Sequence, residues 1–301
     1  MSEEWTERTA IVAAGIRSRV LGHVLRNRGG YLSQALSSAE IFAMLYTRIL
    51  NIGESTAPMI SRSFPGVPGP GNPDFVDGSA YNGPKSPDYD RFIFSPAHYA
   101  LVLYTTLIEV GRLAADGLDH FNRDGGTVEM IGAEHSPGIE TTTGSLAQAL
   151  SQAGGIALAR RLRGDRGRVW VMMSDGEFQE GQTWEAVNAA GYLGLANLRV
   201  VIDANGQQCD GCIDHVSAIE PLAERLVAFG VTAEDVDGHD LLALDAAMRR
   251  ETGKPHFVIA RTDPVHGVPV FAERAPLLHY LQFSSEEERA RYEAAHEEMV
   301  G

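Results

Sequence analysis

Residues 168–211 read RVWVMMSDGEFQEGQTWEAVNAAGYLGLANLRVVIDANGQQCDG, and this stretch decides the fold class. Residues 169–173 and 198–202 are short apolar runs typical of buried strands, and residues 183–193 carry apolar side chains at helical spacing. Two strands joined by a helical crossover of this length lie parallel, with a right-handed connection. The sequence therefore predicts an α/β fold with a doubly wound, mainly parallel sheet and helices on both faces.

Polar residues follow both predicted strands. Asp175 and Gly176 come directly after the first strand, and Asn205 follows the second. Parallel strands bring these residues to the same edge of the sheet, which is where α/β sheets bind ligands. One carboxylate, one amide oxygen and a carbonyl from the turn that ends at Gln207 form an all-oxygen half-shell. Such a set suits a hard divalent cation that also holds phosphate, and Mg²⁺ with a diphosphate fits best.

At these residues the chain resembles the thiamine diphosphate enzymes of the transketolase family, whose signature is a Gly-Asp-Gly turn followed, after the next strand, by Asn. Here the turn is Ser174-Asp175-Gly176, and its first position differs. The residues that follow match the family as well, as Gln179-Glu180-Gly181 and Gly191-Tyr192-Leu193-Gly194-Leu195 do. The resemblance implies thiamine diphosphate and Mg²⁺ as cofactors. It makes Asp175, Asn205 and Gln207 the metal ligands and places Gly176 at the diphosphate.

Two further motifs resemble the family. Residues 90–98 read DRFIFSPAH, which places His98 where the family has a thiamine-binding histidine. Residues 138–146 read GIETTTGSL and resemble Gly-Val-Glu-x-x-Thr-Gly-x-Leu. The resemblance therefore implies that Gly144, Ser145 and Leu146 bind the cofactor, where glycine allows the backbone to approach the aminopyrimidine ring closely.

Two positions depart from the family where it reads sugar hydroxyls. Aligned with the family, Tyr31 and Met130 stand in place of two substrate-contacting histidines. Tyr31 is therefore the candidate substrate residue, although a tyrosine can also simply pack its ring in a loop. His135 lies near the second position and could substitute for the missing imidazole, but the ungapped register does not support it.

Three histidines of the C-terminal third, His239, His266 and His279, bear on the resemblance. Residues 236–240 read VDGHD, a strand-to-helix turn in the family, so His239 is expected to be structural. The resemblance also implies a diphosphate-contacting histidine between the strand at 257–261 and an acidic final helix. Both His266 and His279 lie there, and His279 is favoured because it precedes the acidic segment. The resemblance gives catalytic roles to His279, His98 and Glu180.

The remaining elements follow from periodicity and turn residues. We expect one domain over residues 1–301, with a long loop at about 51–90 and an acidic, solvated C-terminal helix at about 284–299. The other predicted elements are helices at 8–25, from 37 to 50, at 99–114, at 148–160 and at 218–229, and a strand at 257–261.

Composition excludes several classes of protein. The net charge of −15 argues against nucleic-acid or anionic-membrane partners, which require a basic face. No apolar run reaches the roughly twenty residues of a membrane span, and the N-terminus lacks a signal layout, so we expect a cytoplasmic protein. Cys209, Cys212 and His215 form a short cluster, but a structural zinc site needs a fourth ligand that nothing nearby clearly supplies.

Part of the catalytic apparatus is missing from the sequence. Thiamine catalysis needs a carboxylate at the pyrimidine ring nitrogen, and in this family that glutamate belongs to a second domain. The resemblance therefore implies a partner, a C-terminal transketolase-like subunit carrying the pyrimidine-binding domain, in an α2β2 assembly. Glu180, which matches a family glutamate at the interface, would face that partner.

Three functions are consistent with these motifs. The first is the diphosphate-binding subunit of a split transketolase-like enzyme that transfers a two-carbon ketol unit. The second is a related enzyme that decarboxylates a 2-oxo acid and passes the fragment to an acyl carrier or aldehyde; Tyr31 and Met130 favour it. The third is a non-catalytic cofactor-binding subunit, against which Asp175, Asn205 and His98 argue.

Overall fold

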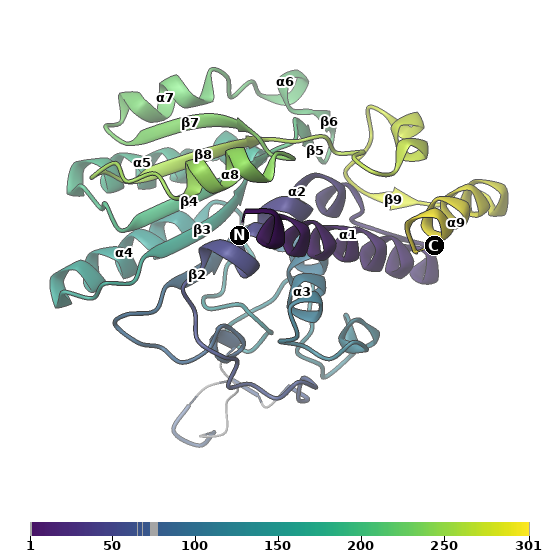
Figure 1. Ribbon diagram of the computed structural model, residues 1–301, viewed down its shortest axis with the longest axis horizontal. Coiled ribbons are helices and arrows are strands. Elements are labelled where there is room, and N and C mark those ends of the chain that lie inside the picture. The colour runs from purple at the N-terminus through teal and green to yellow at the C-terminus, as the bar shows by residue number, and fades with distance from the viewer. Residues whose placement is uncertain (1, 65, 68, 73–77, 301) are drawn as a thin grey trace.

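The computed structural model describes residues 2–64, 66–67, 69–72 and 78–300. Its centre is a five-stranded sheet in which every neighbouring pair is parallel (Figure 1). This confirms the predicted sheet and its direction. In spatial order the strands are β2 (Arg91–Phe94), β3 (Val169–Ser174), β4 (Leu198–Ala204), β8 (His256–Arg261) and β7 (Thr232–Asp237).

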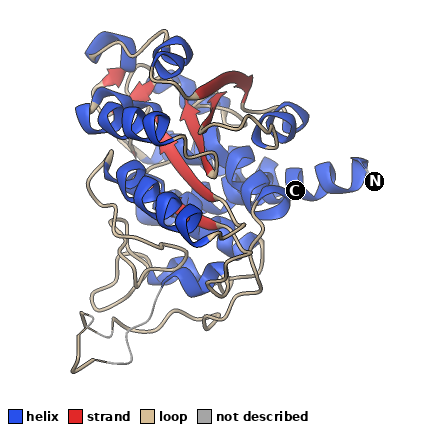
Figure 2. Cartoon of the chain, turned by 90° about the vertical axis from the view of Figure 1, so that its left-hand side faces the viewer, coloured by secondary structure: helices blue, strands red, loops and turns tan. Residues whose placement is uncertain are grey.

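Helices cover both faces of the sheet, as Figure 2 shows. One face packs against α4 (Gln148–Arg163), α5 (Gly181–Leu193) and α7 (Leu222–Ala228). The other carries α1 (Ser2–Asn27), α2 (Ser33–Met44), α3 (Ala100–Glu109) and α8 (Leu241–Met248), and α9 (Glu286–Val300) lies along α1. Within β3, Trp170 belongs to one buried cluster and Val171 to the other, as expected for a strand buried on both faces. The described helices include none long and apolar enough to cross a membrane.

Short elements complete the chain. β1 (Gly29–Gly30) pairs antiparallel with β9 (Leu281–Gln282), a pairing that the sequence analysis did not predict. β5 (Gln207–Gln208) and β6 (Gly211–Cys212) form a hairpin that leads into α6 (Ile213–Val216). A π-helical turn spans Leu45–Ile49, and 3₁₀ turns span Gly78–Asn82, Ala97–Tyr99, Gly117–His120, Asp175–Gln179 and Pro269–Arg274.

The predicted start of the second helix was wrong by one turn. α2 begins at Ser33, not at residue 37, and every residue of it is buried. Ser37 and Ser38, at the predicted start, lie inside the helix, where Ser38 Oγ donates to the Gln34 carbonyl oxygen at 2.5 Å. Serine hydroxyls can bond the carbonyl four residues earlier, so the same residue type serves a helix interior as well as a cap.

Other predicted boundaries also change. α3 ends at Glu109, five residues before the predicted end, because the chain turns at Gly111, whose φ is +72°. α7 begins at Leu222, not at residue 218, and the Glu220 carboxylate caps it by accepting the Leu222 N–H at 2.6 Å. Within 51–90 the described residues form loop apart from the 3₁₀ turn at Gly78–Asn82.

The C-terminal helix is acidic, but it is not only a solvated face. Tyr292 is 1% exposed, and its ring contacts those of Phe283 and Phe271 at centroid distances of 5.2 and 6.3 Å. This buried side chain anchors α9 to the rest of the fold, which explains why so acidic a segment stays attached.

Two glycines give opposite predictions for stability. A Cβ at Gly191 of α5 would lie 2.1 Å from the Phe229 carbonyl oxygen, whereas a Cβ at Gly155 of α4 would meet nothing within 4 Å. Gly191→Ala should therefore destabilise the chain by about 1–3 kcal/mol through overpacking. Gly155→Ala should stabilise it by about 0.5–1 kcal/mol because alanine favours helix. Urea unfolding midpoints of the two variants would test this, and equal shifts would contradict the packing between α5 and the α7–β7 turn.

Candidate cofactor site

The carboxyl ends of the parallel strands meet at one edge of the sheet. Ser174 of β3 pairs with Asp203 of β4, and Ala204 of β4 pairs with Arg261 of β8. A cavity of about 360 Å³ opens at this edge. It brings together most of the residues that the motifs singled out. Its wall consists of Tyr31, Ala97, His98, Met130, Ile131, Gly144, Leu146, Ser174, Asp175, Gly176, Gln179, Glu180, Gln207, Gln208, Cys209 and His279.

Asp175 is the buried carboxylate in the described wall of this cavity. It is 3% exposed, and its two carboxylate oxygens accept the backbone N–H groups of Gly176 and Gly206, each at 2.8 Å. Burial, with a contribution from the nearby Asp203, raises the pKa of Asp175 to about 8. A buried carboxylate that faces a second one is unfavourable unless a cation balances it. The site therefore fits a divalent cation.

Asp203 was not among the predicted site residues, yet it organises this edge. Its carboxylate accepts hydrogen bonds from the hydroxyls of Ser37 and Tyr99, each at 2.6 Å, and from the Thr262 hydroxyl. It also accepts from Asn205 Nδ2 at 3.1 Å. Asp203 is fully buried, and burial raises the pKa of its carboxyl. The sequence analysis did not single it out, because it simply follows the apolar run at 198–202.

Asn205 is oriented by this arrangement. Its Nδ2 group lies within 3.2 Å of the Ser37 and Tyr99 hydroxyls as well as bonding Asp203, so the amide nitrogen faces Asp203. The oxygen points the other way and accepts the Gln207 N–H at 2.9 Å. Asn205 lies behind the cavity wall, 8% exposed, whereas Gln207 is part of the wall.

The atoms available for a cation are therefore oxygens. Gln207 Oε1 is buried and accepts no hydrogen bond from any described residue. Together with the Asp175 carboxylate and the Asn205 amide oxygen, the turn at Gln207 supplies the donor set that Mg²⁺ prefers. The residues present fit the metal and diphosphate that the motifs imply.

Glu177 is a second buried acid that the sequence analysis missed. Its carboxylate accepts the backbone N–H groups of Ser174 at 2.8 Å and Ala147 at 3.0 Å, and it also accepts from the Ser95 hydroxyl. It thus joins the ends of β2 and β3 to the start of α4. Ala147 has a φ of +67°, in the left-handed region that favours glycine.

Three ring side chains line another part of the cavity wall. The His98 ring lies 4.9 Å from that of His279 and 6.0 Å from that of Tyr31, and Tyr31 lies 5.4 Å from His279. Burial, with a contribution from His279, lowers the pKa of His98 to about 3, and burial lowers the pKa of His279. Both imidazoles are therefore neutral at pH 7, and Gln34 holds the His279 carbonyl through a 3.2 Å hydrogen bond. The structure brings His279 into the cavity.

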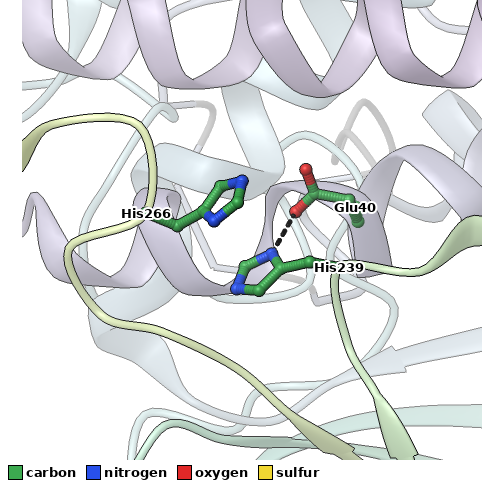
Figure 3. A group of neighbouring side chains, drawn as sticks. All are labelled: Glu40, His239 and His266. Carbon is green, nitrogen blue, oxygen red and sulfur yellow. Dashed lines mark hydrogen bonds and ion pairs between the residues drawn. The ribbon is translucent and has the colours of Figure 1, made fainter.

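His266 lies elsewhere. Figure 3 shows it beside His239 and Glu40, with the two rings stacked at a centroid distance of 3.9 Å. His239 Nδ1 lies 3.0 Å from Glu40 Oε2, and its Nε2 accepts the Asp263 N–H at 2.9 Å, so both ring nitrogens are used. Arg17 binds both oxygens of Glu40. Because a guanidinium already balances the carboxylate, we assign this group a structural role, not a cation site.

Several predicted residues fall outside the cavity wall. Ser145 is exposed, and His135 pairs with Glu129 at 3.0 Å and packs its ring 4.6 Å from that of Phe64. His135 therefore does not take the place of the missing substrate imidazole in this structure. Glu180, in contrast, belongs to the cavity wall and is exposed at the N-terminus of α5.

Cys209 and Cys212 are free thiols. Cys209 lines the cavity at the tip of the β5–β6 hairpin, and Cys212 lies in β6. The described residues that group as possible metal ligands do not include either cysteine or His215, so the zinc interpretation gains no support.

The role of Asp203 can be tested by one isosteric substitution. Asp203→Asn puts an amide among groups that all donate hydrogen bonds, so the Asn205 side chain should lose its fixed orientation. We expect the affinity for Mg²⁺ and thiamine diphosphate to fall at least roughly ten-fold, about 1.4 kcal/mol. Calorimetry would measure it. The exposed Asp116→Asn serves as control, and equal affinities for the two variants would contradict the role of Asp203.

Comparison with known proteins agrees with this geometry. Residues 77–276 match the family model described as transketolase, thiamine diphosphate binding domain. The chain is 34% identical over 278 residues to the uncharacterized transketolase family protein y4mO of Sinorhizobium fredii, covering 89% of this chain and 90% of the relative. It is 30% identical over 275 residues to the 6-deoxy-6-sulfo-D-fructose transketolase subunit SqwG of a Clostridium species, covering 90% of each.

A further relative is an apulose-4-phosphate transketolase subunit of Actinobacillus succinogenes, 30% identical over 258 residues and covering 84% of this chain and 82% of the relative. Among solved structures, the transketolase of Leishmania mexicana superposes with a TM-score of 0.68 at 23% identity, a likeness of fold. That match covers 97% of this chain but 45% of the other, so the chain spans less than half the length of that enzyme. The chain therefore belongs to the transketolase family and matches the N-terminal, thiamine diphosphate-binding subunit of its split members.

Proposed function

We propose that the chain is the diphosphate-binding subunit of a two-component transketolase-like enzyme, which transfers a two-carbon ketol unit with thiamine diphosphate and Mg²⁺. One observation carries the proposal. The cavity at the carboxyl edge of the sheet combines the buried carboxylate of Asp175, whose pKa is raised to about 8, with the neutral imidazoles of His98 and His279. An acidic site that needs a cation, beside neutral hydrogen-bonding groups, suits a metal-bound diphosphate.

The residues divide into three roles. Asp175, Asn205 and the Gln207 turn would hold Mg²⁺, and Gly176 leaves room for the diphosphate. His98 and His279 would each offer a ring N–H to the cofactor. Gly144 and Leu146 would lie against the aminopyrimidine, with Ser145 beside them outside the cavity wall. When bound, thiamine diphosphate supplies the nucleophilic carbon that carries the two-carbon unit.

We further propose that a second chain completes the site. Apolar side chains are exposed around the cavity, with Ile131 60% and Leu146 38% exposed, and Glu180 is exposed beside them. Exposed apolar groups around a half-open site are typical of a surface that another protein covers. A partner with a pyrimidine-binding domain, in an α2β2 assembly, would bring the glutamate that thiamine catalysis needs. Two relatives are themselves named as subunits of transketolases.

A second candidate reaction is the decarboxylation of a 2-oxo acid, with transfer of the fragment to an acyl carrier or aldehyde. Tyr31 and Met130 favour it because both line the cavity, where the family has hydroxyl-reading histidines. Burial raises the pKa of Tyr31, so its hydroxyl remains a neutral donor. A site with fewer hydrogen-bonding groups favours polyhydroxylated substrates less strongly over 2-oxo acids.

Substitutions can distinguish how much each proposed metal ligand contributes to cofactor binding. In the complex with the partner subunit, Asp175→Ala should abolish binding of Mg²⁺ and thiamine diphosphate, because it removes the anionic ligand at the cavity base. Asn205→Ala should weaken binding less, because a neutral amide oxygen is lost. Calorimetry with both ligands measures this, with the exposed Asp116→Ala as control. Wild-type affinity in Asp175→Ala would remove Asp175 from the site.

The substrate preference of the enzyme distinguishes ketol transfer from decarboxylation of a 2-oxo acid. Tyr31→His restores an imidazole at the cavity wall, and regaining one hydrogen bond of roughly 1.4 kcal/mol should shift preference towards a hydroxylated ketose by about ten-fold. The measured quantity is the ratio of kcat/KM for a ketose phosphate and for a short 2-oxo acid or hydroxy ketone, in the wild type and the variant. A wild type that uses xylulose 5-phosphate as its best donor would contradict the role given to Tyr31 and Met130.

A further inference from the structure

One buried amide contacts both the backbone and the ring of His279. Gln34 lies in the first turn of α2 and is 2% exposed. Its side-chain Nε2 donates to the main-chain carbonyl oxygen of His279 at 3.2 Å and lies 3.4 Å from Nδ1 of the same residue. These contacts tie the buried start of α2 to the segment before β9, so a side chain outside the cavity holds one that lines it.

The orientation of the Gln34 amide follows from its neighbours. A main-chain carbonyl oxygen only accepts hydrogen bonds, so the amide end that faces the His279 carbonyl is the NH₂ group. The other end of the amide agrees, because Oε1 accepts the Ser33 hydroxyl at 3.1 Å. One hydrogen of the NH₂ group therefore serves the carbonyl oxygen, and the second is left for the ring nitrogen.

This NH₂ group determines which ring nitrogen of His279 carries the proton. An amide NH₂ group donates and does not accept, so Nδ1 can bond to it only when Nδ1 has no proton of its own. Burial lowers the pKa of His279, so the ring is neutral at pH 7 and has a single N–H. That N–H is therefore on Nε2. A donor at Nδ1 also disfavours the imidazolium ion, in the same direction as burial.

Nε2 is the ring nitrogen of His279 that remains for a ligand. Within the described residues it forms no hydrogen bond, and it is not one of the buried polar atoms that lack a partner, so it is open to the cavity that the ring lines. The His98 and Tyr31 rings lie at centroid distances of 4.9 and 5.4 Å and limit how far the imidazole can rotate. The accessible N–H is thus held in one place.

We propose that Gln34 is a positioning residue that holds His279 as its Nε2–H tautomer, so that this donor meets the diphosphate of the cofactor. The inference rests on the proposed function, which places thiamine diphosphate in this cavity. Oxygens of an ionised diphosphate only accept hydrogen bonds, so the opposite tautomer would turn the lone pair of Nε2 towards them. Gln34 thus prepares the ring for an anionic ligand before that ligand binds.

The first test determines the tautomer by NMR in the full-length chain without cofactor. In ¹⁵N-histidine-labelled protein, the chemical shift distinguishes protonated from unprotonated ring nitrogens, and the signals lost in His279→Asn assign the residue. At about pH 9, wild-type His279 should carry its proton on Nε2 alone. In Gln34→Glu an ionised carboxylate, which only accepts, replaces the donor, so Nδ1 should gain a proton.

The control for this measurement is Gln282→Glu, because Gln282 is an exposed glutamine of β9 near His279. Its spectrum should show His279 as in the wild type. A proton on Nδ1 in the wild type would overturn the proposal, and so would an unprotonated Nδ1 in Gln34→Glu.

The second test asks whether Gln34 acts through the His279 ring. Calorimetry with thiamine diphosphate and Mg²⁺ on the two-subunit complex compares Gln34→Met, His279→Ala and the double variant, with Gln282→Met as control. Gln34→Met should weaken binding roughly three- to ten-fold, because one hydrogen bond to the ring is lost. It should have no further effect in His279→Ala, because the ring that it orients is gone.

The outcomes separate this inference from the proposed function. A loss that persists in His279→Ala would assign the effect of Gln34 to its backbone contact and overturn the positioning role, as would no loss in either background. In both cases thiamine diphosphate still binds, so the proposed function stands. If the wild-type complex binds no thiamine diphosphate, the proposed function fails and the role of Nε2 towards a diphosphate fails with it, whatever tautomer the NMR spectrum shows.

Discussion

Four hydrogen-bond donors from four parts of the chain converge on the buried carboxylate of Asp203, and the cofactor site depends on this convergence. Ser37 comes from α2, Tyr99 from the turn after β2, Asn205 from the end of β4 and Thr262 from the end of β8. Burying a carboxylate is costly unless such donors compensate it, so the four segments are held together at the sheet edge. The same contacts turn the Asn205 oxygen away from Asp203 and place a second negative charge near Asp175.

Two other connections shape the space above that edge. Glu177 ties the Asp175 turn to the start of α4, and the pairing of β1 with β9 joins the region of Tyr31 to that of His279. The first connection fixes the turn that carries Asp175. The second connection holds Tyr31 and His279 together on the aromatic side of the cavity. A scaffold built from distant segments thus positions groups with different chemical tasks.

The central strands and their direction could be predicted because their apolar runs and the crossover between them are local signals. Asp175 could be found for the same reason, since it directly follows a strand. Asp203 could not, because its importance comes from donors far away in the sequence, and nothing in its local pattern differs from an ordinary strand end. The acidic segment that follows His279 favoured it over His266, but its position beside His98 and Tyr31 could not be predicted, because the two-residue β1–β9 pairing leaves no periodicity in the sequence.

The most direct measurement is a crystal structure of the complex grown with thiamine diphosphate and Mn²⁺, in which anomalous scattering locates the ion. If the two buried carboxylates and the oriented amide form a cation site, the peak will lie against Asp175, Asn205 and the Gln207 turn, with Asp203 behind them still bonded to Asn205. An ion bound instead at Glu40, His239 and His266, or a cofactor bound without an ion at Asp175, would contradict that conclusion.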